Sequence, residues 1–249
     1  MSGHSKWASI KHKKGAADAK RGKLFTKIIK EITTAAKLGG GDPTGNPRLR
    51  KALDDAKAAN MPAENMERAV KKGTGELEGV MYEEVDYGGT GPSGVMILVQ
   101  TMTDNRNRTV SELRKIFSKH NGTLGETASV DWMFNKVGLI EVKSGDVSED
   151  ELMEAGMDAG IEDIRGAGEF WEVVTSTSAL YAVKEALEGA DIKVARAEVV
   201  RIPQSTVKLE GRNAEVFLRM CDIIEDHEDV QKVWDNSEID DSVLQQLSS

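Results

Sequence analysis

Apolar residues in the first 75 positions recur every three or four residues, which is the period of an α-helix. This pattern predicts three short amphipathic helices, which start near Ala16 or Lys23, at Asn46-Pro47 and at Pro62. An asparagine cap followed by proline is a typical helix start, and glycines end the first and third helices. Three such helices with short loops predict a small helical bundle.

After a linker at Thr74–Gly79, the pattern changes to short strands that alternate with short helices. The expected strands cover 80–87, 95–101, 129–134, 139–143, 170–175, 194–202, 206–209 and 230–234, and the expected helices 110–120, 148–159, 178–187 and 213–224. From Ser237 onward the chain is polar, and we expect a frayed tail. The alternation predicts α+β sandwiches with the helices on one face of each sheet.

Charge divides the chain close to the point where the hydrophobic pattern changes. Residues 1–75 contain 17 Lys and Arg against 7 Asp and Glu, whereas residues 76–249 contain 16 against 35. The whole chain has a formal net charge of −9, so a basic first segment precedes a strongly acidic remainder. Such asymmetry indicates that the basic part contacts a polyanion, of which nucleic acid is the usual example.

The first thirty residues supply most of the candidate nucleic-acid-binding side chains. They are Lys6, Trp7, Lys11, His12, Lys13, Lys14, Lys20, Arg21, Lys23, Lys27 and Lys30. Lysine can neutralise phosphates, Trp7 can stack on a base, and His12 can hydrogen-bond a phosphate. At about 100° per residue, the lysines from position 20 onward lie opposite Phe25 and Ile28. The sequence thus predicts a mobile arm that continues into a docked helix with an outward lysine face; a solvated lysine-rich tail is the simpler alternative.

A second candidate is the stretch Asp104-Asn-Arg106-Asn-Arg108-Thr109, which precedes the predicted helix 110–120. Thr109 or Asn107 can cap this helix, and both arginines stand at the positive end of its dipole. One hypothesis is that Arg106 and Arg108 contact phosphates beside the helix N-terminus. The alternative is a capping turn in which the arginines pair with nearby acids.

Other motifs do not predict a catalytic or cofactor site. Gly89–Gly94 matches G-x-G-x-x-G, but a strand follows it rather than a helix, so we interpret the glycines as a wide hairpin. The four histidines and the single cysteine show no metal-ligand spacing, and Cys221 lies on the apolar face of a predicted helix. No Ser, His or Lys stands beside the acidic pairs in a catalytic pattern. We therefore expect no enzymatic activity, cofactor or metal.

Composition also bears on location and partners. No apolar run approaches the ~20 residues that cross a bilayer, and no apolar stretch follows the basic N-terminus as in a secretory signal. One cysteine suits a reducing cytoplasm. We therefore expect a cytoplasmic protein without membrane contact.

Only 5% of residues are aromatic, so the predicted sheets are poor base-stacking platforms. The acidic domains are expected to bind protein or to shape how the basic domain docks.

The opening GHSKWASIKHKKGAADAKRGKLFTKIIKEI closely resembles the signature of the YebC/PmpR family. The likeness continues through Asn60-Met-Pro, Glu67-Arg-Ala-Val-Lys-Lys-Gly, Tyr82-Glu-Glu, Asp104-Asn-Arg-Asn-Arg-Thr and Trp132-Met-Phe, and so covers nearly the full chain. These bacterial proteins are described as transcriptional regulators, and a mitochondrial relative activates translation. The resemblance implies a middle domain, 76–134 plus 204–249, interrupted by an inserted domain, 135–203. We expect both to be ferredoxin-like sandwiches behind a helical domain, 1–75.

Together, these observations predict a non-enzymatic nucleic-acid-binding regulator of gene expression. The resemblance favours DNA binding in transcriptional control. A factor that binds ribosomal RNA and assists translation is the first alternative, since lysines suit phosphates better than base edges. A protein-binding adaptor that works through its acidic domains is the second. The oligomeric state stays open.

Overall fold

The computed structural model describes residues 17–248 of the chain. Their contacts divide them into two compact units, Trp132–Ser205 and a second unit that combines the chain before Trp132 with the chain after Ser205. The second unit contains the N-terminal helices and one four-stranded sheet, and the first unit contains the other sheet. The expected boundary near residue 75 between a helical and a middle domain stays a prediction.

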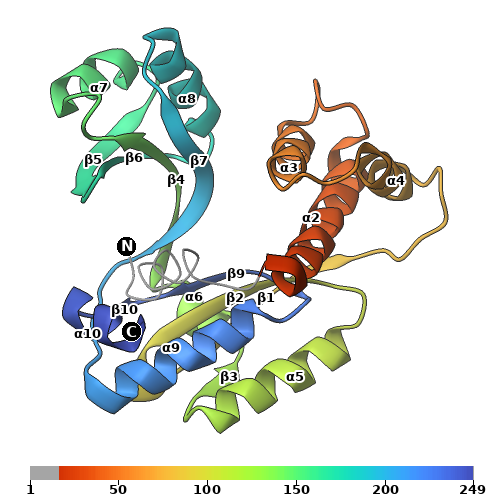
Figure 1. The fold of residues 1–249 in the computed structure, drawn as a ribbon, viewed down its shortest axis with the longest axis vertical. Helices are drawn as coiled ribbons and strands as arrows, with labels where there is room; N and C mark the ends of the chain where they lie inside the picture. The colour runs from red at the N-terminus through yellow and green to blue at the C-terminus, as the bar shows by residue number, and fades with distance from the viewer. Residues whose placement is uncertain (1–16, 249) are drawn as a thin grey trace. The chain divides into compact units, whose positions relative to one another are not determined.

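Three helices form the N-terminal part of the chain, as the hydrophobic pattern predicts. They are α2 (Ala17–Gly39), α3 (Pro47–Ala58) and α4 (Ala63–Thr74) (Figure 1). Their shared core includes Ile32, Leu49 and Ala56, which are fully buried. Asn46 caps α3 by accepting a hydrogen bond from the Leu49 amide, and its side-chain amide donates to the carbonyls of Ala35 and Gly40 at the C-terminal end of α2. This asparagine therefore joins the two helices.

The sheet of the second unit has four antiparallel strands in the order β3-β1-β2-β9. They are β1 (Glu83–Thr90), β2 (Met96–Thr103), β3 (Thr123–Gly125) and β9 (Val230–Asp235). The helices α5 (Arg106–Lys119) and α9 (Gly211–Glu225) lie side by side on one face of this sheet (Figure 1). Phe117 of α5 and Phe217 of α9 fill the core between helices and sheet. Strand β9 thus brings the end of the chain beside β2.

The β1–β2 connection is a hairpin, as we interpreted its glycines. A 3-10 turn, η1 (Pro92–Gly94), joins the strands, and Ser93 and Gly94 have positive φ angles of 59° and 77°. Glycine is also required earlier, at Gly89, because a Cβ there would lie 2.5 Å from the ring of Phe117. The glycines therefore serve the turn and close packing of a helix on the strand.

The unit Trp132–Ser205 has a second antiparallel sheet, in the order β5-β6-β4-β7. Its elements are β4 (Phe134–Lys143), α7 (Glu149–Gly156), β5 (Ile161–Ala167), β6 (Phe170–Thr175), α8 (Leu180–Gly189) and β7 (Val194–Pro203). Both helices pack on one face of the sheet around Ile140, Val173 and Val183. The chain order βαββαβ with this strand order is the ferredoxin-like arrangement.

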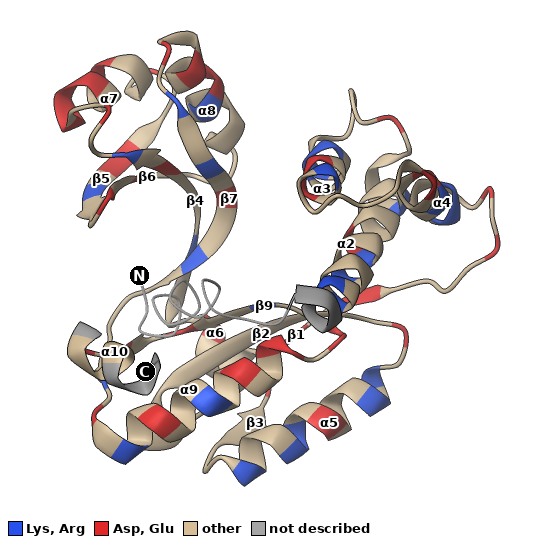
Figure 2. Ribbon diagram, in the orientation of Figure 1, with Lys and Arg blue, Asp and Glu red and all other residues tan. Residues whose placement is uncertain are grey.

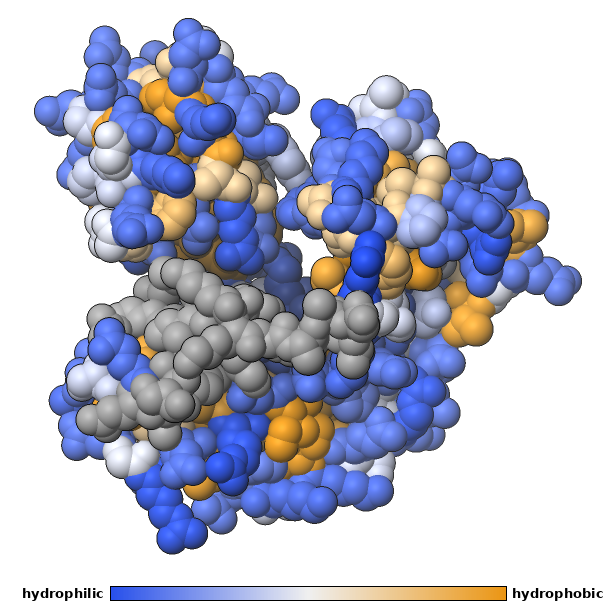
Figure 3. Space-filling view, in the orientation of Figure 1, coloured by the Kyte–Doolittle hydropathy of each residue, from blue (hydrophilic) through white to orange (hydrophobic). Residues whose placement is uncertain are grey.

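The overall class is therefore α+β, with N-terminal helices followed by antiparallel sheets, and this part of the prediction is confirmed. The sheet of the second unit also has four antiparallel strands with two helices on one face, but its two inner strands, β1 and β2, are joined directly by a hairpin. Hydrophilic residues cover most of the face seen in Figure 3, and the apolar areas on it are small.

Three local predictions are wrong. The stretch predicted as strand 129–134 begins with a short helix, α6 (Ala128–Asp131), because the amides of Val130 and Asp131 bond to the carbonyl of Thr127. Strand β5 was missed because charged residues interrupt its alternation of apolar positions. The end of the chain, expected to be frayed, forms β10 (Ser237–Glu238), which pairs with β8 (Val207–Lys208), and α10 (Asp241–Ser248). Ile239 and Leu244 bury this segment in the core.

Candidate nucleic-acid interface

The lysines of α2 do not all face solvent, because the end of α9 and the loop after it pack against them. Lys23 Nζ lies 3.4 Å from the Asp226 carboxylate, at the surface. One turn on, Lys27 Nζ donates to the Glu225 carbonyl at 2.6 Å. A helix C-terminus carries unpaired carbonyls and partial negative charge, so cations are stabilised there. The basic helix thus docks on the negative end of another helix.

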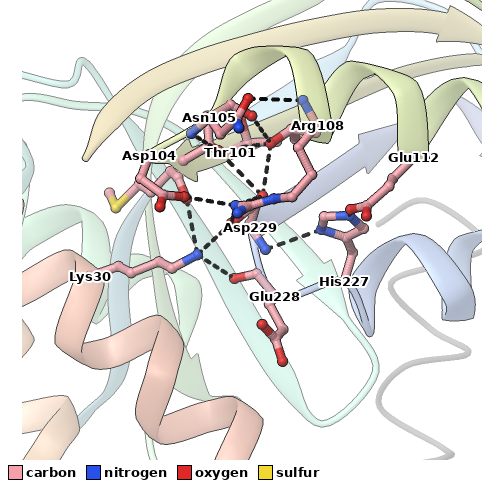
Figure 4. A network of polar contacts seen from close by, with 12 residues as sticks. Lys30, Thr101, Asp104, Asn105, Arg108, Glu112, His227, Glu228 and Asp229 are labelled. Carbon is pink, nitrogen blue, oxygen red and sulfur yellow. Dashed lines mark hydrogen bonds and ion pairs between the residues drawn. The ribbon is translucent and has the colours of Figure 1, made fainter. Parts of the chain in front are cut away.

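Lys30 lies deeper than the other two lysines, and the residue is only 5% exposed. Its Nζ donates to the carbonyls of Glu228 and Met102, at 3.0 Å and 3.2 Å, and to the Asp229 carboxylate at 2.6 Å (Figure 4). It also lies 5.3 Å from the centre of the Tyr82 ring. Three oxygen acceptors satisfy the three donors of the ammonium group. The prediction of an outward lysine face is therefore wrong for Lys30.

Asp229 is the centre of this polar network (Figure 4). The residue is 2% exposed, and its carboxylate accepts from Lys30 at 2.6 Å, Arg108 at 2.9 Å and Thr109 at 2.7 Å. Burial acts to raise the pKa of Asp229, but the hydrogen bonds from these three residues outweigh it and lower the pKa to about 2. Asp229 therefore remains ionised near neutral pH and joins α2, α5 and β9.

The start of α5 supplies the other two groups of the network. Asn105 caps this helix by accepting a hydrogen bond from the Arg108 amide, so neither Thr109 nor Asn107 is the cap. Arg108 binds both Asp104 and Asp229, and these bonds raise the pKa of its guanidinium. Arg106 pairs with Glu83 at 2.6 Å, although its side chain is 63% exposed. Both arginines are thus paired with acids, as in the capping-turn alternative.

The other predicted binding residues are distributed along the N-terminus. Lys6, Trp7, Lys11, His12, Lys13 and Lys14 lie outside the described residues, and Lys20 is placed in α2 only by its backbone. Arg21 is exposed, with its guanidinium 5.5 Å from the centre of the Phe25 ring. Burial lowers the pKa of Lys27, although the charges of Glu225 and Asp226 act in the other direction. The structure thus separates exposed cations at the start of α2 from docked ones further along.

Sequence reasoning missed Asp229 and its neighbours. The Asp229 amide donates to His227 Nδ1 at 3.1 Å, so the ring proton lies on Nε2, which contacts Glu112 at 2.8 Å. Asp229 follows a run of acids that is typical of a solvated surface. No local pattern in the sequence distinguishes Asp229 from these exposed acids. The one available signal is complementarity, since a basic helix face that packs inward requires acceptors opposite.

Cys221 has a structural role, and the described residues contain neither a metal-binding group nor a membrane-spanning helix. Cys221 is fully buried in the core of α9, and burial raises the pKa of its thiol well above the ordinary value. Among residues 17–248, no group of three or more His, Cys, Asp and Glu side chains is arranged to hold a metal ion. No helix within the same range is both long enough and apolar enough to span a membrane.

Comparison with known proteins assigns the family. The model of the TACO1/YebC protein N-terminal domain matches residues 5–76, and the model of the TACO1/YebC second and third domain matches residues 82–237. This chain belongs to the TACO1/YebC family. The resemblance seen in the sequence is thereby confirmed over most of the chain.

Relatives of the TACO1/YebC family align with the chain almost end to end. A protein of Geobacter sulfurreducens is 58% identical over 247 residues, which is 99% of this chain and 100% of the relative. A protein of Desulfosudis oleivorans is 57% identical and covers 98% of this chain and 99% of its own length. Both are named probable transcriptional regulatory proteins. The TACO1/YebC relatives are thus named as regulators.

A solved structure shares the fold. The crystal structure of a conserved hypothetical protein from Aquifex aeolicus matches with a TM-score of 0.83 and 47% sequence identity. The match covers 95% of this chain and 98% of that chain. This likeness supports the fold and not a function.

Proposed function

We propose that the protein is a non-enzymatic, nucleic-acid-binding regulator of gene expression that contacts phosphates through its basic N-terminal segment. The supporting observation is the concentration of cations at one end of an acidic chain: residues 1–30 hold nine Lys and Arg and a single acid. Polyanion binding by such a segment is mainly electrostatic. DNA is the first target we propose, because the relatives are named as transcriptional regulators.

The structure supports a division of roles among the cations of α2. Arg21 is exposed, and Lys23 forms a surface ion pair with Asp226. Such pairs contribute about 0–1 kcal/mol, so a phosphate can replace the carboxylate at little cost. Lys27 and Lys30 are already bound to protein oxygens. We assign phosphate contacts to the arm, Lys20, Arg21 and Lys23, and docking of the helix to Lys27 and Lys30.

We assign different roles to the two arginines at the start of α5 in the same way. Arg106 is mostly exposed and its surface pair with Glu83 can be exchanged for a phosphate. Arg108 is held by the buried Asp229 and by Asp104, so we assign it to the network rather than to the ligand. Asp229, with a pKa of about 2 and donors on both oxygens, is unsuited to accept a proton near neutral pH.

RNA, including RNA on the ribosome, is the second candidate target. Lysine neutralises phosphates, whereas sequence-specific reading of DNA relies mainly on Arg, Asn and Gln side chains at base edges. Within the described part of α2, Arg21 is the residue of that kind, and its guanidinium lies against Phe25. Contacts limited to phosphates suit structured RNA as well as they suit DNA. The two targets therefore differ by shape rather than by charge.

The test is affinity as a function of salt for the full chain. Random duplex DNA of about 25 base pairs and purified ribosomes are titrated between about 50 and 300 mM salt. Five to eight phosphate contacts give a slope of log K against log salt of roughly −4 to −7 on DNA. Tighter binding to ribosomes at about 150 mM would select the RNA target. Binding without salt dependence to either one would contradict the proposal.

A further inference from the structure

Helix α5 carries a basic face that the proposed contacts leave unused. Arg114, Lys115 and Lys119 are exposed on this helix, and Figure 2 shows Lys and Arg along it. No acidic residue occurs between Leu113 and Gly125. This is unusual in a region, 76–249, where acids outnumber bases by 35 to 16. The local excess of positive charge therefore runs against the composition around it.

The fold directs these three cations to solvent. Leu113 and Phe117 are fully buried between α5, β2 and α9, and so fix which side of the helix faces inward. Arg114, Lys115 and Lys119 lie on the outer sides, where Ser111 and Ser118 are the small residues between them. From Arg114 to Lys119 the helix rises about 7–8 Å at 1.5 Å per residue. That length is comparable to the spacing of two neighbouring phosphates on a nucleic-acid strand.

Local acids do not neutralise this face. Many exposed cations on other helices have an acid one turn away, as in Lys51–Asp55, Arg68–Glu64 and Arg219–Glu215. Arg114 and Lys119 have no acid three or four residues away in the sequence. Glu112 stands three residues before Lys115, but its carboxylate contacts His227 at 2.8 Å. The positive charge of α5 thus stays available to a ligand.

We propose that Arg114, Lys115 and Lys119 form a second phosphate-binding surface, which holds the same nucleic acid as the N-terminal segment. This inference rests on the proposed function and extends it to the middle of the chain. His120 ends the surface, where its Nδ1 donates to the Ile116 carbonyl at 2.8 Å.

The Asp229 network explains how two surfaces can act together. Lys30 of α2 and Arg108 of α5 bind the same buried carboxylate, so the two helices are fixed to one point. Contacts by a second surface on a fixed frame add affinity without a second loss of rotational freedom. Three cations alone would bind weakly, whereas the combined surfaces bind as one site.

The experiment compares two variants that each lose three positive charges. The first is Arg114→Gln/Lys115→Gln/Lys119→Gln in the full chain. The matched control is Lys136→Gln/Lys143→Gln/Lys193→Gln, which removes exposed cations from the other unit. Duplex DNA and duplex RNA of one sequence, about 25 base pairs long, serve as probes across salt concentrations. Circular dichroism of both variants checks that they fold.

We expect the α5 variant to bind at least one probe about tenfold more weakly at 100 mM salt. Its slope of log K against log salt should be flatter by about two to three units, while the control keeps the slope of the unaltered chain. The probe with the larger loss identifies DNA or RNA. Equal slopes in the two variants would overturn the second surface and leave the proposed function standing. If the unaltered chain binds neither probe, the proposed function fails, and the second surface with it.

Discussion

The two ends of the basic stretch of α2 use the same chemistry for different purposes. At its start, Arg21 is exposed and Lys23 forms a surface pair with Asp226. Two turns later, Lys30 is buried and bound by a buried carboxylate and two carbonyls. Exposed pairs exchange partners at little cost, whereas a buried charge that loses its partner is strongly destabilising. The comparison shows that position along one helix separates exposed cations from cations bound to protein oxygens.

The largest effect is expected from breaking the buried end. Asp229→Ala leaves Lys30 without its carboxylate partner in a buried site and removes one of the two acids that bind Arg108. We expect the free energy of unfolding, measured with urea, to fall by about 3–5 kcal/mol. Asp226→Ala, which breaks only the surface pair with Lys23, should lower it by less than about 1 kcal/mol. Equal losses would show that burial does not distinguish the two ends.

Lowering the pH should also weaken the buried end of α2, with a smaller loss of stability than Asp229→Ala causes. The folded-state pKa of Asp229 is about 2, below the ~3.9 of an unfolded aspartate, so its ionisation stabilises the fold above the unfolded pKa. This contribution, about 2–3 kcal/mol, is lost as pH falls from about 5 through 2. Urea unfolding at several pH values should therefore show a steeper acid loss in the unaltered chain than in Asp229→Asn. Parallel curves for the two proteins would rule out a strongly depressed pKa at this site.

Much of the fold could be predicted from local patterns. The three N-terminal helices follow from a clear 3.6-residue period, and Asn46-Pro47 marks the start of α3. The hairpin at Gly89–Gly94 follows from strand patterns on both sides of the glycines. Strand β5 could not be predicted in this way, because Glu162, Asp163 and Arg165 hide its alternation. The final segment was mistaken for a tail because Ile239 and Leu244 are isolated apolar residues.

The candidate site was predictable in part. Helical phase predicted one shared side for the lysines, and Lys23, Lys27 and Lys30 do contact the segment 225–229. Ile28 and Ile32 lie instead in the core of the N-terminal helices. Helical phase could not show that Lys30 is buried, because the carboxylate that binds it lies 199 residues further along the chain. The same holds for Arg108, whose partner Asp229 is 121 residues away. Contacts of this range depend on the whole fold and leave no signal in a short stretch of sequence.

The most direct test of the division along α2 compares salt dependence in two variants with the same charge change. The full chain is prepared as Arg21→Gln/Lys23→Gln and as Lys27→Gln/Lys30→Gln, with Lys27→Gln alone added in case the second variant is partly unfolded. Binding to random duplex DNA is then measured across salt concentrations. The first variant should flatten the slope of log K against log salt by about two units, because two phosphate contacts are lost. Lys27→Gln/Lys30→Gln and Lys27→Gln should keep the slope of the unaltered chain. If either of them is folded and flattens the slope as much, per charge removed, as Arg21→Gln/Lys23→Gln, the account is contradicted.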